Sequence, residues 1–131
     1  MHIYNLPFFT SMGFVVPLYY YPQYNYLGFI VFFTYLNSVT FWSNPVLYRN
    51  TLVHKLDSFT ARLCILSFVF YKFVINGKNV VLFSANTLYM LYFFYLSNRV
   101  SSRYWCSHQH ISLHLFAHIL GINSIYIALM N

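Results

Sequence analysis

The C-terminal part of the sequence concentrates imidazole side chains in a segment that is otherwise apolar. Residues 107–120, "SHQHISLHLFAHIL", hold four histidines, and His110, His114 and His118 recur at every fourth position. Residues four apart on a helix are displaced by about 40° around the axis and about 6 Å along it. The spacing predicts a ridge of imidazoles on which two neighbours, above all His114 and His118, bind one metal ion or one substrate.

Two further polar groups stand out elsewhere in the chain. Asp57 is the only acidic residue, and Ser38 lies near the end of an apolar run. Imidazoles together with one carboxylate suit zinc, which lowers the pKa of a bound water to about 7. A Ser–His–Asp triad fits less well, because the sequence shows no nucleophile elbow and no oxyanion loop. A metal site is therefore the better chemical prediction.

The composition decides which solvent these groups lie in. Hydrophobic residues make up 60% of the 131 residues and charged residues only 6%, against about 25% charged in soluble domains. A soluble domain this short cannot hide so much apolar surface. The seven Lys and Arg residues are scattered beside apolar runs, which fits helix orientation in a bilayer and excludes a nucleic-acid-binding face. The partner expected first is thus the lipid bilayer.

Five apolar stretches approach the length of about 20 residues that a membrane-spanning helix needs. They predict an all-α, polytopic transmembrane helical bundle of four to five spans in a single domain, residues 1–131, with spans at 6–21, 27–42, 56–75, 79–96 and 110–130. Pro17 interrupts the first stretch, which is the weakest of the five. The sequence "NGKN" between the third and fourth predicts a tight turn, in which Gly77 is free to take a positive φ.

The basic residues also predict an orientation. Segments 43–56 and 97–109 carry most of the Lys and Arg close to span ends, so the positive-inside rule places both inside and the C-terminus outside. In this alternating topology Ser38, Asp57 and the histidine ridge all fall near the same membrane face. Ionisable groups within spans usually face the bundle interior and mark functional sites, so we expect these side chains to meet in one pocket.

The polar residues also form a pattern with a known counterpart. Residues 37–59, "NSVTFWSNPVLYRNTLVHKLDSF", and the C-terminal helix resemble small polytopic proteins of large DNA viruses and protists. Through them the chain resembles the membrane hydrolase superfamily of alkaline ceramidases, adiponectin receptors and GPI-attachment proteins. The positions that carry the resemblance are Ser38, Trp42, Asn44, Pro45, Asp57, Trp105, His114 and His118.

This resemblance implies a metal-dependent hydrolase of lipid amides or esters, or an inactive relative of one. It implies zinc on His114 and His118, with Asp57 orienting or activating the water and Ser38 holding the water or the substrate. Trp42 stands where the superfamily has its first histidine. His54, one helical turn before Asp57, is therefore the candidate for the missing third ligand.

Other readings of the same residues stay open. The histidines could form hydrogen bonds between helices, and Asp57 could pair with Arg62 or Lys55. A chain rich in Phe and Tyr and nearly free of acid also suits a non-catalytic accessory subunit of a membrane complex such as a respiratory one, in which histidines could bind haem. The absence of Glu beside 15 Phe also fits a translated reading frame without evolved function.

Overall fold

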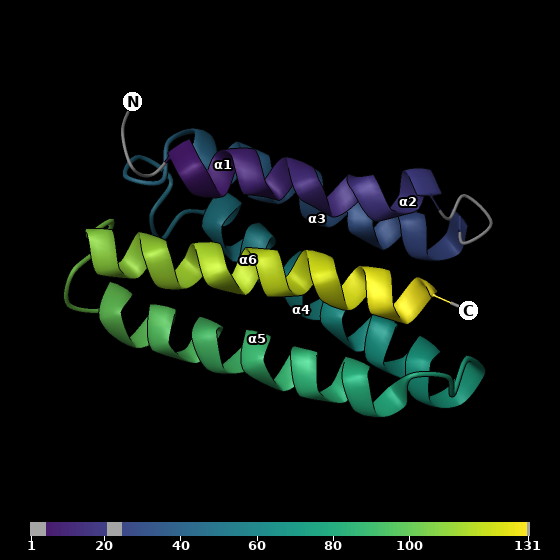
Figure 1. Ribbon diagram of the computed structural model, residues 1–131. Helices are drawn as coiled ribbons and strands as arrows, with labels where there is room; N and C mark the ends of the chain where they lie inside the picture. Colours follow the sequence, from purple (N-terminus) through teal and green to yellow (C-terminus); the bar gives the residue numbers. More distant parts are fainter. Residues whose placement is uncertain (1–4, 21–24, 131) are drawn as a thin grey trace.

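The computed structural model describes residues 5–20 and 25–130, and all regular structure in this part of the chain is helical (Figure 1). The helices are α1 (Asn5–Met12), the 3-10 turn η1 (Gly13–Val15), α2 (Val16–Tyr20), α3 (Asn25–Ser43), α4 (Leu52–Phe70), the π-helical η2 (Tyr71–Ile75), α5 (Val80–Ser101) and α6 (His108–Leu129). The predicted all-α fold is therefore confirmed, and each predicted segment coincides with one helical unit.

The helix ends differ from the predicted ones, since apolar runs do not mark where polar capping residues begin or end a helix. Helix α4 begins at Leu52 rather than Leu56, and α5 continues to Ser101 rather than ending at Leu96. The predicted end of the first segment, residue 21, lies outside the described residues.

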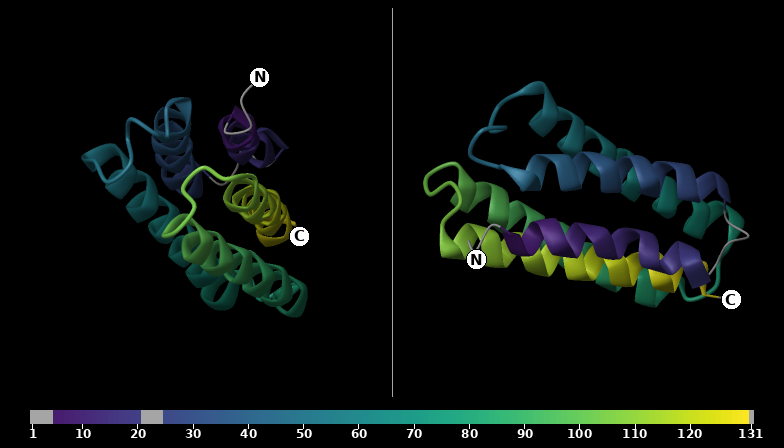
Figure 2. Two further views of the ribbon diagram at one scale, coloured as in Figure 1. Left: turned by 90° about the vertical axis from the view of Figure 1, so that its left-hand side faces the viewer. Right: turned by 90° about the horizontal axis from the view of Figure 1, so that it is seen from above.

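The bundle consists of two helix pairs joined by the N-terminal segment. Helix α3 packs against α4, and α5 packs against α6, while α1 contacts both α3 and α6. Helices α4 and α5 make few direct contacts with each other. The connections 44–51 and 102–107 lie at the same end of the bundle (Figure 2), as the alternating topology predicts. We call this end the loop end.

Two separate clusters of buried apolar side chains lie toward the two ends of the bundle. Phe68, Phe83 and Leu129 belong to the cluster at the end away from the loops. Phe41 and Trp42 belong to the cluster at the loop end. The middle of the bundle, between the two clusters, is where the helix pairs leave space.

The N-terminal segment lies close to α6 because a glycine on each side leaves room for a large side chain of the other, Gly13 for Ile122 and Gly121 for Phe14. A Cβ added at Gly13 would lie 2.6 Å from Ile122, and one added at Gly121 would lie 3.2 Å from Phe14. The segment changes helix type at η1, and Pro17 is the second residue of α2, where its missing N–H removes no intrahelical hydrogen bond. The interruption predicted at Pro17 is thus a change of helix type between α1 and α2, and the chain keeps its direction there.

The turn between η2 and α5 corrects one prediction. Asn79, and not Gly77, takes the left-handed conformation, with φ of 56°. Asparagine tolerates this region because its short polar side chain bonds locally. Just before the turn, Lys72 is fully buried and its Nζ donates to the carbonyl oxygens of Ile127 and Ala128, at 3.2 and 3.4 Å. The end of the α4–η2 helix is thereby attached to the C-terminal end of α6.

Polar side chains also join α5 to α6 within their apolar surroundings. Asn86 Nδ2 donates to the carbonyl oxygen of Leu120 at 2.8 Å and to Ser124 Oγ at 2.6 Å. Asn123 Nδ2 donates to Asn86 Oδ1 at 2.8 Å, and Thr87 and Ser124 share a hydrogen bond of 3.2 Å. Such bonds hold helices together where water is absent.

Among residues 5–20 and 25–130, three helical units are long and apolar enough to cross a membrane: Leu52–Ile75, Val80–Ser101 and His108–Leu129. A shorter apolar helix covers Leu27–Ser43. Their outer surfaces carry large apolar side chains, such as Leu66 at 64% and Val81 at 84% exposure. An apolar surface of this kind is what a lipid-facing helix presents.

Candidate functional site

A cavity of about 420 Å³ lies between the two helix pairs toward the loop end, and we call it the polar cavity. Its walls come from η1, α3, α4, α5, α6 and the connection before α6. Among the residues that line it are all the predicted site residues, namely Ser38, His54, Asp57, His114 and His118, together with His110. The structure therefore brings together side chains that are up to 80 positions apart in the sequence (Ser38 and His118).

Asp57 lies in the wall of the polar cavity and is only 8% exposed. Ser38 lines the same cavity, and its Oγ lies 2.9 Å from Ser11 Oγ of α1. Within the described ranges no Lys, Arg or His forms an ion pair with this carboxyl group. The pairing with Lys55 or Arg62 that the sequence left open is thus not formed.

His118 is fixed by a hydroxyl group from the N-terminal segment. Its Nδ1 lies 3.0 Å from Thr10 Oγ1. The Thr10 hydroxyl donates its own proton to the backbone carbonyl groups of Leu6 and Pro7, both at 3.2 Å. The Thr10 hydroxyl can accept from an Nδ1–H of His118, or turn to donate to a bare Nδ1, so this contact holds the ring in place in either tautomer.

His114 has the same arrangement with a hydroxyl group from α5. Its Nδ1 lies 3.4 Å from Ser97 Oγ, and Ser97 donates to the backbone carbonyl oxygen of His110, also at 3.4 Å. The Ser97 hydroxyl likewise contacts His114 in either tautomer, as an acceptor or, when it turns, as a donor. The ring centroids of His114 and His118 are 4.6 Å apart.

In the other two histidines of the cavity, Nδ1 accepts a hydrogen bond from a backbone N–H. The backbone N–H of Asn50 donates to His54 Nδ1 at 3.1 Å, and that of Cys106 donates to His110 Nδ1 at 3.0 Å. Both donors precede a helix N-cap and have positive φ, 60° and 56°. Each histidine is the third residue after the N-cap, the position from which Glu or Gln reaches back in a capping box. His54 and His110 are therefore helix caps whose Nε2 carries the proton.

The sequence carries a signal for these two helix caps that the prediction of site residues did not use. Both helices start with Thr or Ser followed three residues later by His, in "TLVH" and "SHQH". This is the capping-box spacing with His in place of Glu or Gln. The hydrogen bond to Nδ1 gives His54 a structural role, and it leaves no lone pair on Nε2 for the metal that was assigned to it.

We compared the cavity with what zinc requires. Zinc takes three or four protein ligands from His, Cys, Asp and Glu. In the described ranges, no three of these side chains are grouped so that they could hold a metal ion. His114 and His118 each have a hydroxyl group beside Nδ1, an outer contact that metal-binding histidines use, but they lack a third partner. The residues do not form a zinc site in this conformation, and zinc stays a prediction from the resemblance.

Trp42 is a member of the site that sequence reasoning treated only as a substitution. It is 1% exposed and its ring packs against His114, with 4.6 Å between centroids. Its Nε1–H is buried and finds no hydrogen-bond acceptor among the described residues. The indole thus supports His114 by packing.

Trp105 closes the loop end of the polar cavity. Its Nε1 donates to the backbone carbonyl oxygen of Pro45 at 3.3 Å, and the guanidinium carbon of Arg49 lies 4.8 Å from the centroid of its ring. Asn44 caps the same connection by accepting from the Leu47 N–H at 3.2 Å. Asn44, Pro45 and Trp105, which belong to the resemblance, therefore form contacts within and between the two connections at the loop end.

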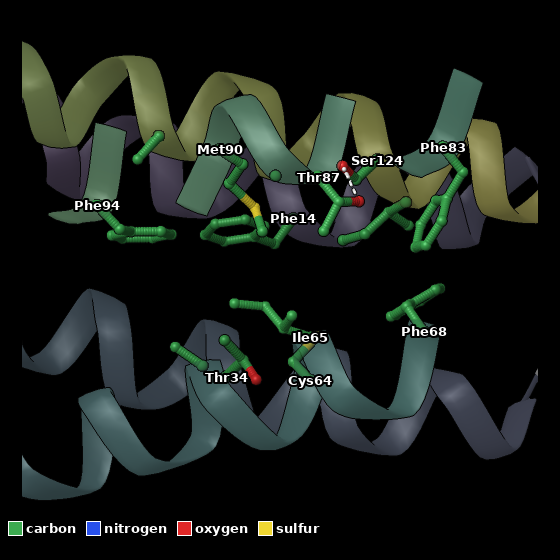
Figure 3. Close-up of a pocket in the computed structure, with 14 residues that line it drawn as sticks. Phe14, Thr34, Cys64, Ile65, Phe68, Phe83, Thr87, Met90, Phe94 and Ser124 are labelled. Atoms are coloured by element: carbon green, nitrogen blue, oxygen red, sulfur yellow. Dashed lines mark hydrogen bonds between the residues drawn. The ribbon is translucent and has the colours of Figure 1, made fainter. Parts of the chain in front are cut away.

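A second, smaller cavity of about 50 Å³ continues from the polar cavity toward the middle of the bundle, and we call it the apolar cavity. In Figure 3, side chains of α4 (Cys64, Ile65, Phe68) face side chains of α5 (Phe83, Met90, Phe94) across it. The two cavities share five lining residues, which are Phe14, Thr34, Ala61, Ile65 and Phe94. They therefore lie next to each other, and we call them together the joined cavities.

No family model, curated protein or solved structure matches this chain. The resemblance to the membrane hydrolase superfamily therefore stays a prediction, and the geometry of the cavity has to carry the functional argument.

Proposed function

We propose that this chain is a multi-pass membrane protein, of four or five spans, that binds a single-chain amphipathic lipid in the joined cavities between its helix pairs. Three long apolar helices and the shorter one in α3 supply the spans. The short helices α1 and α2 supply the fifth if they cross, because together with η1 they run alongside α6.

The observation that carries this proposal is that a polar cavity and an apolar cavity lie next to each other. Ser38, Asp57 and the histidines give the larger cavity hydrogen-bonding groups, while Phe68, Met90 and their neighbours give the smaller one an apolar wall. Ligand sites are mostly apolar cavities with a few polar groups that orient the ligand. A molecule with a small polar head and an aliphatic chain matches both parts.

The cavity is also open where a lipid would reach it. Arg62 of α4 and Leu91 and Tyr95 of α5 line the polar cavity and are exposed on the outer surface. Since α4 and α5 make few contacts with each other, the opening lies between them and faces the acyl chains of a bilayer. The apolar cavity holds the first part of a chain, and the remainder extends into the surrounding lipid.

A second candidate function is hydrolysis of an amide or ester in the bound lipid. It is favoured by Ser38, Asp57 and His114 lining one cavity. An imidazole acceptor can take a proton from an attacking water, and Asp57 or Ser38 can hold that water by hydrogen bonds. Release of a fatty acid from a single-chain amide or ester, lost in His114→Ala, is the measurement that supports it.

Lipid binding can be measured with the protein's own fluorescence. The chain has two tryptophans, Trp42 and Trp105, and both line the polar cavity. In nanodiscs of diacyl phospholipid, a single-chain lipid brominated along its chain should quench this fluorescence saturably.

Ala61→Phe should abolish the saturable quenching, because Ala61 lines both cavities and the larger side chain fills the space between them. Ala85→Phe is the matched control, since Ala85 is exposed on α5. Quenching that rises linearly with probe concentration in the unaltered protein, as it does for lipid merely surrounding the protein, would overturn the proposal.

A further inference from the structure

We propose that the head group of the bound lipid is an oxyanion, a phosphate or a carboxylate, and that Arg62 holds it at the opening of the polar cavity between α4 and α5. This inference rests on the proposed function, because it names the chemical class of the lipid that the joined cavities take.

The first argument is the depth at which Arg62 lies. It is the eleventh residue of the helical unit Leu52–Ile75, so at 1.5 Å per residue it lies about 15 Å from the loop end of that unit. The other six Lys and Arg residues all lie within three positions of a span end, where water and lipid head groups solvate their charge. The membrane surface therefore does not explain the position of Arg62, and a charge at this depth is costly unless it is paired.

The second argument is that the chain supplies no negative partner. The only acidic residue, Asp57, lies five positions before Arg62, which is about 140° around the helix axis. Asp57 is 8% exposed in the cavity wall, whereas Arg62 is exposed at the outer edge, and within the described ranges the two form no ion pair. The guanidinium group therefore takes its partner from outside the chain. Its planar fork of N–H donors fits the oxygens of a carboxylate or a phosphate.

The third argument is a set of further donor groups at the same opening. Three polar side chains line the cavity there and form no hydrogen bond with another residue of the described ranges, namely Ser58 of α4 and Tyr95 and Asn98 of α5. Ser58 lies one helical turn before Arg62, so the two are neighbours on one face of α4. Hydroxyl and amide N–H groups left without a partner among acyl chains are costly, and an oxyanion is an acceptor for such groups.

The fourth argument is the path that this position gives to the lipid chain. Ala61 and Ile65, one position before and three positions after Arg62, line both cavities. An aliphatic chain attached to a head group at Arg62 therefore passes along α4 into the apolar cavity. The phosphates of the surrounding diacyl lipids lie nearer the helix ends, so Arg62 reaches them only by extending its side chain toward the surface. A head group inside the opening meets Arg62 at its own depth.

The test uses three probes with the same chain: dodecyl phosphate, dodecanol and dodecyltrimethylammonium. Each competes with the brominated single-chain lipid in nanodiscs of zwitterionic diacyl phospholipid, and its affinity is expressed by its mole fraction in the bilayer. We expect the phosphate to bind about tenfold more tightly than the alcohol, a factor that one hydrogen bond to a charged group supplies. The quaternary ammonium should bind more weakly than the alcohol, and inorganic phosphate, which has no chain, should not compete.

Arg62→Gln should remove the preference for the phosphate while leaving binding of the alcohol unchanged. Arg99→Gln is the matched control, because it makes the same change of charge at an exposed residue in the last turn of α5 that lines neither of the two cavities. It should keep the preference. A second measurement needs no variant: dodecyl phosphate should protect Arg62, and not Arg99, from modification by phenylglyoxal, as followed by mass spectrometry of the labelled protein.

Equal affinity for phosphate and alcohol in the unaltered protein would overturn the inference while leaving lipid binding intact. Equal loss of the preference in Arg62→Gln and Arg99→Gln, or equal protection of the two arginines, would also overturn it, because the net charge and not the opening would then attract the phosphate. If the brominated probe itself gives no saturable quenching, the proposed function fails, and that result is distinct from the others.

Discussion

The side chain of Asn86 makes the strongest testable claim about how α5 and α6 hold together. It forms three hydrogen bonds to α6, with Leu120, Asn123 and Ser124, at 2.6 to 2.8 Å. Polar bonds between membrane helices average about 0.6 kcal/mol and reach about 1.7 kcal/mol. Since Asn86→Ala removes all three, the free energy of unfolding should fall by about 2 kcal/mol.

The measurement is equilibrium unfolding in mixed detergent micelles, followed by helical circular dichroism and by tryptophan fluorescence. Asn37→Ala is the matched control, because Asn37 Nδ2 donates only to the carbonyl oxygen of Phe33 in its own helix, at 2.9 Å. The control makes the same chemical change without breaking a bond between helices, so it should lower the unfolding free energy by less than about 1 kcal/mol.

A double-mutant cycle separates one bond from the rest. Asn123→Ala breaks only the bond to Asn86 Oδ1, so the coupling energy between the two substitutions should be about 0.6 kcal/mol. If Asn86→Ala costs no more than Asn37→Ala, or if the cycle shows no coupling, α5 and α6 are not held by these bonds and the packing described above is wrong.

Three further predictions concern the helix ends, the N-terminal segment and the loop end. Ser107→Ala removes the hydroxyl that accepts from the His110 N–H at 3.2 Å, so it should lower the unfolding free energy by about 1 kcal/mol; an unchanged unfolding curve would contradict the capping role. Gly121→Leu places a side chain where a Cβ alone is already 3.2 Å from Phe14, so overpacking should cost about 1–3 kcal/mol and increase proteolysis of the first helix. Burial raises the pKa of the Cys106 thiol, so less thiolate is present at neutral pH. Iodoacetamide should therefore modify Cys106 more slowly than a cysteine in a short peptide, at a rate that rises with pH. Mass spectrometry after labelling measures this rate, and a rate equal to the peptide's would refute the prediction.

The positions of the helices and the convergence of polar groups could be predicted from the sequence. A run of about 20 apolar residues in a membrane forms a helix, because few other structures satisfy its backbone hydrogen bonds there. Short connections then force successive helices to run in opposite directions. Ser38 near the end of one helix, Asp57 near the start of the next, and His118 in the first half of the last are therefore brought to similar depth by chain direction alone.

The roles of the individual histidines could not be predicted in the same way. Whether an imidazole donates or accepts depends on which neighbour meets its Nδ1, and this depends on how each helix is rotated about its axis. The partners of His118 and His114 are Thr10 and Ser97, and no spacing in the sequence relates these pairs. The left-handed turn residue was missed for a related reason, because Asn79 and Gly77 are both permissive and only the packed turn selects between them.

The regular spacing of the histidine row therefore conceals a difference in chemistry along α6. His110 accepts a hydrogen bond from the backbone of the preceding loop, so its Nε2 carries the proton, while His114 and His118 contact hydroxyl groups through Nδ1. A hydroxyl group both donates and accepts, so its contact suits either tautomer, whereas a backbone N–H only donates and selects one. Because Asp57 lines the same cavity as His114 and His118, these two histidines, and not the helix cap His110, are the ones whose hydrogen bonding can adapt to a ligand.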